Sequence, residues 1–221
     1  MNITRASIAF AAVLSLLAFS QSAYATPITI DKVTMSAGVL QVTGPGITGT
    51  YRGGQSDFYD TVNGVETLMF SAFCVDLYHT MKIGVESPVL IFDTGTLTEN
   101  FNGLGVSNEV AFKIDWLIAN GINTTPLQEL ATQAVIWRLL FPEVTVTSNN
   151  ASIEAAIDDL NGNIGSISSL PITYLPREEP WGQPQAFAGP GTQVSEASTM
   201  LIMLLPFGIL FAYRKRIVAI A

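Results

Sequence analysis

The stretch TTPLQELATQAVIWRLLFP, residues 124–142, carries the local signals of one complete helix. Thr125 is the expected N-cap, Pro126 stands at the first helical position, and Gln128 completes a capping box. Pro142 cannot continue the helix and is expected to end it. The spacing therefore predicts a helix of about four turns within this stretch.

Gln133 lies in the middle of the apolar face of this predicted helix. Its neighbours three, four and seven positions away along the helix are all apolar: Leu130, Ile136, Trp137 and Leu140. Burying an amide without a partner costs about 1–3 kcal/mol. We therefore expect the Gln133 carboxamide to be either hydrogen-bonded or chemically consumed.

The chain on either side of this helix predicts an α+β domain. Short β-rich runs, a hairpin turn at Asn63-Gly64 and helix start and stop signals follow one another along the sequence. Strands are expected at 28–30, 39–42, 68–78, 89–92 and 172–175, and further helices from Ser107 or Asn108 to Gly121 and from 153 to 160. The order of elements predicts a β-sandwich or barrel with a helical subdomain in its second half.

The single cysteine of the chain, Cys74, lies in FCVDLYH, residues 73–79. A lone cysteine is most often a small buried apolar residue. Here a predicted strand carrying a thiol is expected to pack against the predicted helix that buries a carboxamide. A thiolate that attacks this carboxamide expels ammonia and leaves an internal thioester between Cys74 and Gln133.

This chemistry sets requirements for the surrounding residues. The thiol must lose its proton, and the finished bond must be shielded from water. Phe73, Tyr78 and Trp137 are the candidate shielding residues, and Asp76 is a candidate assisting group that could equally cap a turn. Alternation along a strand would place His79 on the face opposite Cys74, which disfavours it as the base.

Phe73-Cys74-Val75 together with Thr132-Gln133-Ala134-Val135-Ile136-Trp137 resembles the thioester domains of bacterial surface adhesins. That family carries an aromatic-Cys-aliphatic segment and a later Thr-Gln-x-Ala-aliphatic-Trp segment. The resemblance implies an internal Cys–Gln thioester, with Cys74 and Gln133 at the two bonding positions. It also implies covalent attachment to amine or hydroxyl nucleophiles on a surface or matrix, without enzymatic turnover.

Composition excludes several other classes of function. Between Thr26 and Ala197 the chain has six cations and all 18 of its acids, a net charge of −12, which disfavours nucleic-acid binding. One cysteine cannot form an intramolecular disulfide, and the single histidine excludes a multi-histidine metal site. We expect no cofactor and no metal.

The N-terminus, residues 1–25, resembles a cleaved signal peptide. Arg5 precedes an apolar run from Ile8 to Phe19, and Ala23-Tyr24-Ala25 is a small-x-small cleavage pattern. An uncleaved anchor is the alternative, although the run is shorter than the ~20 residues a span needs. The sequence therefore predicts export and processing by signal peptidase.

The C-terminus predicts a tether. Residues 176–198, rich in Pro, Gly, Gln and Glu, indicate a linker after a domain at 26–175. Residues 199–221 contain an apolar span followed by Arg214, Lys215 and Arg216, which favours a transmembrane anchor with its basic end inside. A buried core helix is the alternative.

This tail resembles the PEP-CTERM sorting signal, although Ser195 and Ala197 replace the usual prolines while Glu196 is kept. The resemblance implies an exosortase-like partner and display on the surface or release from the cell.

Three functions remain open from the sequence. The first is an exported surface protein that attaches covalently through the thioester. The second is a structural or exopolysaccharide-associated matrix protein in which Cys74 and Gln133 only pack. The third is a thiol enzyme of the Cys–His type, which requires His79 to reach the thiol.

Overall fold

The computed structural model describes residues 28–35, 38–79, 90–98, 105–176 and 185–190. The predicted signal peptide and the predicted sorting tail, with Glu196, Arg214, Lys215 and Arg216, lie outside these residues. None of the helices in the described part is both long and apolar enough to cross a bilayer.

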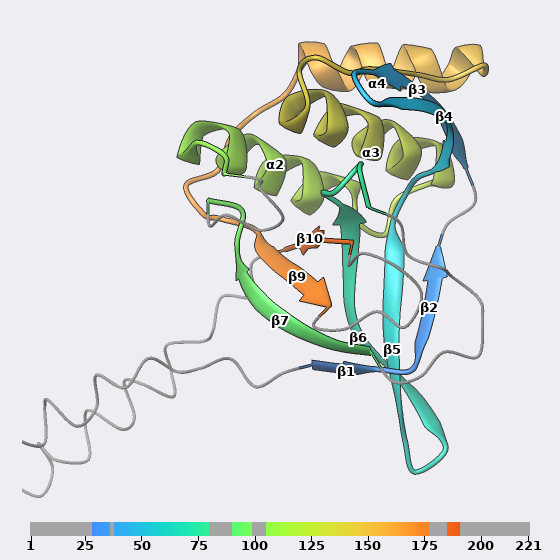
Figure 1. The fold of residues 1–221 in the computed structure, drawn as a ribbon, viewed down its shortest axis with the longest axis vertical. Helices are drawn as coiled ribbons and strands as arrows, with labels where there is room; N and C mark the ends of the chain where they lie inside the picture. Colours follow the sequence, from blue (N-terminus) through green and yellow to red (C-terminus); the bar gives the residue numbers. More distant parts are fainter. Residues whose placement is uncertain (1–27, 36–37, 80–89, 99–104, 177–184, 191–221) are drawn as a thin grey trace, which may run out of the picture.

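Seven antiparallel strands form the larger of two sheets. In spatial order they are β1 (Ile28–Ile30), β7 (Leu90–Thr96), β9 (Ile172–Pro176), β10 (Phe187–Gly189), β6 (Val65–Cys74), β5 (Ser56–Val62) and β2 (Lys32–Met35). The two edge strands, β1 and β2, are separated in the chain by Asp31 alone. The sheet must therefore curl until its edges meet, and β1 contacts β5. The result is the barrel-like body in the lower half of Figure 1.

Aromatic rings fill the inside of this barrel. The Phe58 ring stacks on Phe70 with centroids 4.4 Å apart and meets Phe187 edge-on at 4.9 Å. Phe70 also stacks on Tyr174 at 3.8 Å. Pairs of this kind add about 0.5–1.5 kcal/mol each beyond the area they bury. The cluster joins β5, β6, β9 and β10 into one core.

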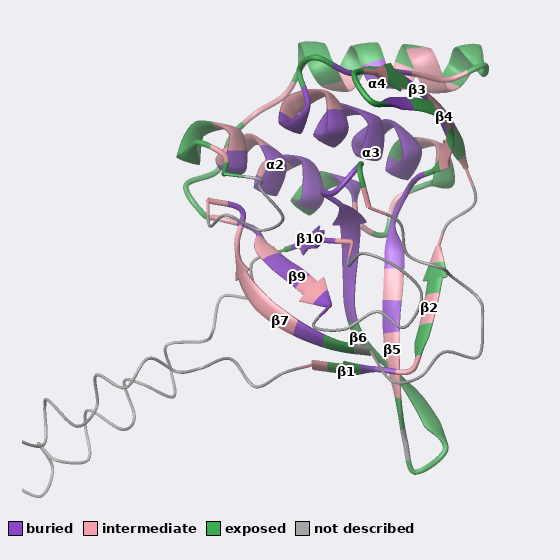
Figure 2. Ribbon diagram, in the orientation of Figure 1, coloured by how far each residue is buried: buried purple, intermediate pink, exposed green. Residues whose placement is uncertain are grey.

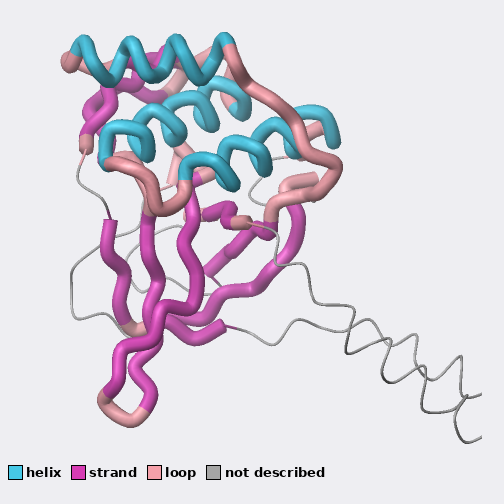
Figure 3. Tube along the Cα trace, turned by 180° about the vertical axis from the view of Figure 1, so that it is seen from behind, coloured by secondary structure: helices cyan, strands magenta, loops and turns pink. Residues whose placement is uncertain are grey.

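Three helices lie beyond one end of the barrel: α2 (Asn108–Gly121), α3 (Pro126–Leu140) and α4 (Ala151–Gly162), with α4 packed on α3 (Figure 1). The small sheet of β4 (Ile47–Arg52), β3 (Val39–Gly44) and β8 (Thr145–Thr147) packs beside them. Helix α3 contacts α2, α4, β3 and β8, so most of its residues are buried (Figure 2). The described part thus confirms an α+β fold with its helices in the second half, as Figure 3 shows from behind.

Local signals in the sequence correctly predicted the starts of two helices and one hairpin turn. Ser107 caps α2, and Thr125 caps α3 with the reciprocal capping box to Gln128. Asn63 and Gly64 have φ of 54° and 77°, the left-handed conformations that a tight two-residue hairpin requires between β5 and β6.

Several predicted boundaries differ from the structure, and two of the differences bear on the region around Cys74. Strand β6 ends at Cys74, whereas the sequence predicted a β-run as far as Tyr78. Residues 187–189 were expected in the linker, but they form β10, a buried strand between β9 and β6. A three-residue strand leaves no periodicity to detect, and its pairing comes from partners far away in the chain.

Candidate functional site

Cys74, the last residue of β6, has a strand on one side only. On that side it lies opposite Phe187 of β10. On the other side the pairing of β5 with β6 begins at Ser56, which faces Ala72, two residues before Cys74. The backbone beside Cys74 is therefore open to a partner that is not a strand.

The side chain of Gln133 occupies this place. The Cys74 N–H donates to Gln133 Oε1 at 3.0 Å, and Gln133 Nε2 donates to the Cys74 carbonyl at 2.7 Å. The carboxamide takes the two bonds that a neighbouring antiparallel residue would take. With a C=O bond of about 1.23 Å, its carbon lies within about 4.2 Å of the Cys74 nitrogen.

The Gln133 side chain is completely buried and closely packed along its stem. Gln133 is 0% exposed in the centre of α3. A Cβ on Gly53 would lie 3.1 Å from Gln133 Cγ and 3.1 Å from methyl groups of Leu130 and Leu40. A larger residue at position 53 would therefore require the Gln133 stem or its leucine neighbours to shift by a few tenths of an ångström.

The sulfur has its own set of partners. Cys74 Sγ donates to the carbonyl of Asp76 at 3.0 Å, and Gln185 Nε2 donates to the sulfur at 3.1 Å. The indole N–H of Trp137 lies near enough to the sulfur to lower the thiol pKa. Its geometry does not qualify as a hydrogen bond to any described residue. The thiol is thus surrounded by donors within an apolar environment.

Burial is the main reason that the pKa of the Cys74 thiol is raised to about 12; the hydrogen bond to the Asp76 backbone lowers this pKa, the charge of Asp76 raises it, and Trp137 and Gln185 lower it by smaller amounts. Water is excluded at this position, because Cys74 is 3% exposed. At neutral pH the sulfur therefore keeps its proton. Any reaction of the thiol must pass that proton to another atom of the site.

The residues after Cys74 form a compact turn. The Asp76 carboxylate accepts the backbone N–H groups of Tyr78 and His79, at 3.2 and 3.3 Å, and holds the His79 ring at 2.6 Å from Nδ1. Strand β6 ends at Cys74, so the alternation that the sequence argument used to place His79 on the opposite face does not extend to His79. Asp76 has the turn-capping position that the sequence left open.

The predicted shielding residues divide into two groups. Phe73 and Trp137 are buried, at 0% and 2% exposure. Tyr78 is 45% exposed and meets Phe141 edge-on at 5.5 Å, which places it at the surface and not in the apolar wall. Gln185 was missed, because the sequence around it has the Pro- and Gly-rich composition of a linker and gives no signal of contact with a thiol.

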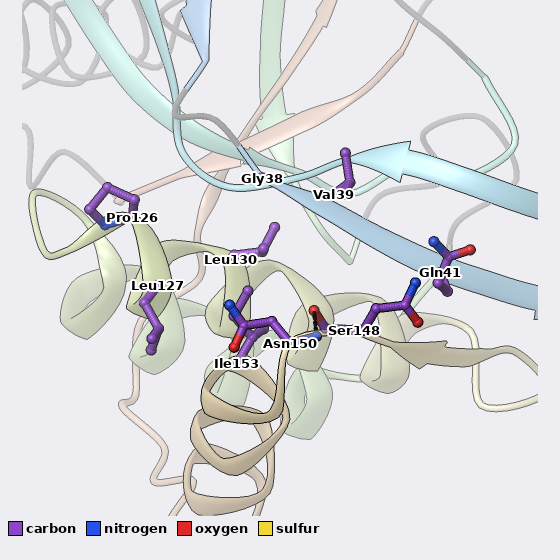
Figure 4. A pocket seen from close by; sticks show the side chains of 10 residues that line it. Gly38, Val39, Gln41, Pro126, Leu127, Leu130, Ser148, Asn150 and Ile153 are labelled. Carbon is purple, nitrogen blue, oxygen red and sulfur yellow. Dashed lines mark hydrogen bonds between the residues drawn. The ribbon is translucent and has the colours of Figure 1, made fainter.

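The described residues also contain a pocket, but they contain no metal site. A hollow of about 500 Å³ opens between β3 and the first turns of α3 and α4, lined by Gly38, Leu127, Asn150 and Ile153 among others (Figure 4). Neither Cys74 nor Gln133 lines it. No group of three or more His, Cys, Asp or Glu in these residues could hold a metal ion.

Two solved structures resemble this fold. The first is the N-terminal thioester domain of a surface protein from Clostridium perfringens, in a cysteine-to-alanine mutant, with 13% identity and a TM-score of 0.46, covering 61% of this chain and 86% of that chain. The second is the N-terminal thioester domain of a surface protein from the same organism, with 11% identity and a TM-score of 0.43, covering 69% of this chain and 98% of that chain. No family model and no curated protein matches the sequence.

Proposed function

We propose that Cys74 and Gln133 form an internal thioester, through which the protein attaches covalently to an amine or hydroxyl on a surface or matrix. The observation that carries this proposal is the pair of hydrogen bonds between the Gln133 carboxamide and the Cys74 peptide groups, at 3.0 and 2.7 Å. They hold an electrophilic carbon beside the only thiol of the chain, in a place closed to water.

The arrangement suits the chemistry of closure. A side chain stands roughly perpendicular to its sheet, whereas the two hydrogen bonds to the carboxamide lie along the sheet. The sulfur is therefore expected to lie outside the plane of the amide group, as the addition of a nucleophile to a face of a carbonyl carbon requires. The Cys74 N–H already donates to Gln133 Oε1, the oxygen on which negative charge develops.

The balance of the step is simple. The bond from Cys74 Sγ to Gln133 Cδ forms, the bond from Cδ to Nε2 breaks, and the thiol proton leaves with the nitrogen as ammonia. In the later step an incoming amine or alcohol bonds to Cδ, and Cys74 recovers its thiol. Each molecule attaches once, so the proposal describes no enzymatic turnover.

The predicted export and membrane tether fit the proposed function. Export, processing by signal peptidase and an exosortase-like enzyme, and a C-terminal membrane tether would present this domain to nucleophiles outside the cell. The two Clostridium perfringens domains are described as thioester domains of surface proteins, and we propose the same chemistry for this chain.

A non-covalent role is the second candidate, and one observation favours it. Both polar atoms of the Gln133 side chain already have partners, so the carboxamide is satisfied without a new bond. In that case the two hydrogen bonds between Gln133 and Cys74 only join α3 to β6 within a matrix protein, a structural role that we call a strut. Attachment to a surface would then persist when Cys74 is replaced.

The intact mass of the purified domain separates the two candidates. We expect wild-type protein to be lighter than its sequence by one ammonia, because the thioester has lost Nε2. Cys74→Ala is expected to have its full sequence mass. A wild-type mass equal to that of the unmodified sequence would contradict the thioester and leave the strut as the function of the pair.

A further inference from the structure

Gln185 is a second glutamine at the sulfur, on the opposite side of the site from α3. Its Nε2 lies 3.1 Å from Cys74 Sγ, 3.1 Å from the Asp76 carbonyl oxygen and 2.9 Å from the His79 carbonyl oxygen, so its two hydrogens are shared among three acceptors. One amide group therefore contacts the reacting atom and both ends of the turn that follows it. No other described side chain donates to this sulfur within hydrogen-bond geometry.

We propose that Gln185 is the residue that orients the Cys74 sulfur and stabilises its negative charge when the thioester opens. The inference rests on the proposed thioester. Opening breaks the bond between Cδ and Sγ and leaves the electron pair on sulfur, while the proton of the attacking amine passes to the sulfur or to water. An amide N–H aimed at that sulfur makes it a better leaving group.

The position of Gln185 is fixed by the backbone around it. Phe187 lies opposite Cys74, and the Val75 N–H donates to the Ala186 carbonyl at 3.0 Å. Residue 185 is therefore held next to the turn of residues 75–79. Gln185 is half-buried.

Gln185 precedes strand β10, which lies beyond the domain boundary that the sequence predicted. Strand β10 is the last strand in the described residues, and it is inserted between β9 and β6. The domain of about 150 residues predicted from the sequence ends before it. The site is complete only when the chain beyond residue 176 returns to the sheet.

Opening by methylamine tests this role, with intact mass as the readout against time. We expect Gln185→Met, which has a similar length and no donor, to open about tenfold to a hundredfold more slowly than wild type, because a hydrogen bond to a charged group is lost. Gln185→Glu is also expected to slow opening, whereas Gln185→Lys keeps an N–H donor and is expected to open at least as fast as wild type. Thr173→Val, on the neighbouring strand β9, is the control and is expected to leave the rate unchanged.

The outcomes separate this inference from the function it rests on. A wild-type domain with no ammonia loss overturns the thioester itself. A wild-type thioester that opens at the same rate in Gln185→Met overturns the role of Gln185 and leaves the thioester standing. If Gln185→Met does not fold, the Glu and Lys variants decide: equal rates in both would show that the amide only packs, and opposite effects support donation to the sulfur.

Discussion

Methylamine is expected to add to one residue of the wild-type domain, Gln133, and Cys74→Ala is expected to abolish this adduct completely. Without the sulfur, the Gln133 carboxamide is an ordinary amide that does not react with amines under mild conditions. The effect is therefore all or none. Peptide mapping by mass spectrometry after incubation with methylamine locates the adduct.

Gln128, the exposed capping glutamine of the same helix, supplies the control. Gln128→Ala is expected to keep the methylamine adduct at Gln133, since its side chain only caps the first turn of α3. Adducts spread over several glutamines, or an adduct at Gln133 that survives in Cys74→Ala, would contradict a thioester formed by this pair.

Replacing Gln133 by leucine in the Cys74→Ala background is expected to lower the free energy of unfolding by roughly 2–5 kcal/mol. The background removes any thioester, so the change reports only the hydrogen bonds. Leucine leaves the N–H and the carbonyl of residue 74 buried without partners, and each such group costs about 1–3 kcal/mol. Urea denaturation monitored by circular dichroism measures the difference.

Gln41→Leu is the matched control for this prediction. Gln41 lies half-buried on β3 and accepts a hydrogen bond from Thr50 at 3.0 Å in a solvent-exposed setting. The same chemical change there is expected to alter stability by about 0.5 kcal/mol or less. If Gln133→Leu were as mild as the control, the carboxamide would not be what joins α3 to β6.

The helix that carries Gln133 could be predicted from the sequence because its signals are local. The cap at Thr125 and the apolar face around Gln133 depend on residues within four positions of each other. The same reasoning correctly predicted a buried amide in need of a partner. It could not identify that partner as the peptide groups of Cys74, because every residue has the same backbone groups and the sequence does not show which of them lack a partner.

Long-range pairing explains what the sequence missed. The barrel closes because β1 and β2, separated only by Asp31, join opposite edges of one sheet. Gln185 reaches the sulfur because β10 pairs with β6, more than 100 positions earlier in the chain. Such contacts are set by the packing of the whole core, and no periodicity over a short window reveals them.

A crystal structure of the purified wild-type domain at high resolution tests the central claim most directly. We expect continuous electron density from Cys74 Sγ to Gln133 Cδ, the acyl oxygen still bonded to the Cys74 N–H, and no atom at the Nε2 position. Separate side chains, with Nε2 in place and donating to the Cys74 carbonyl, would show that the pair is a strut and that the thioester does not form.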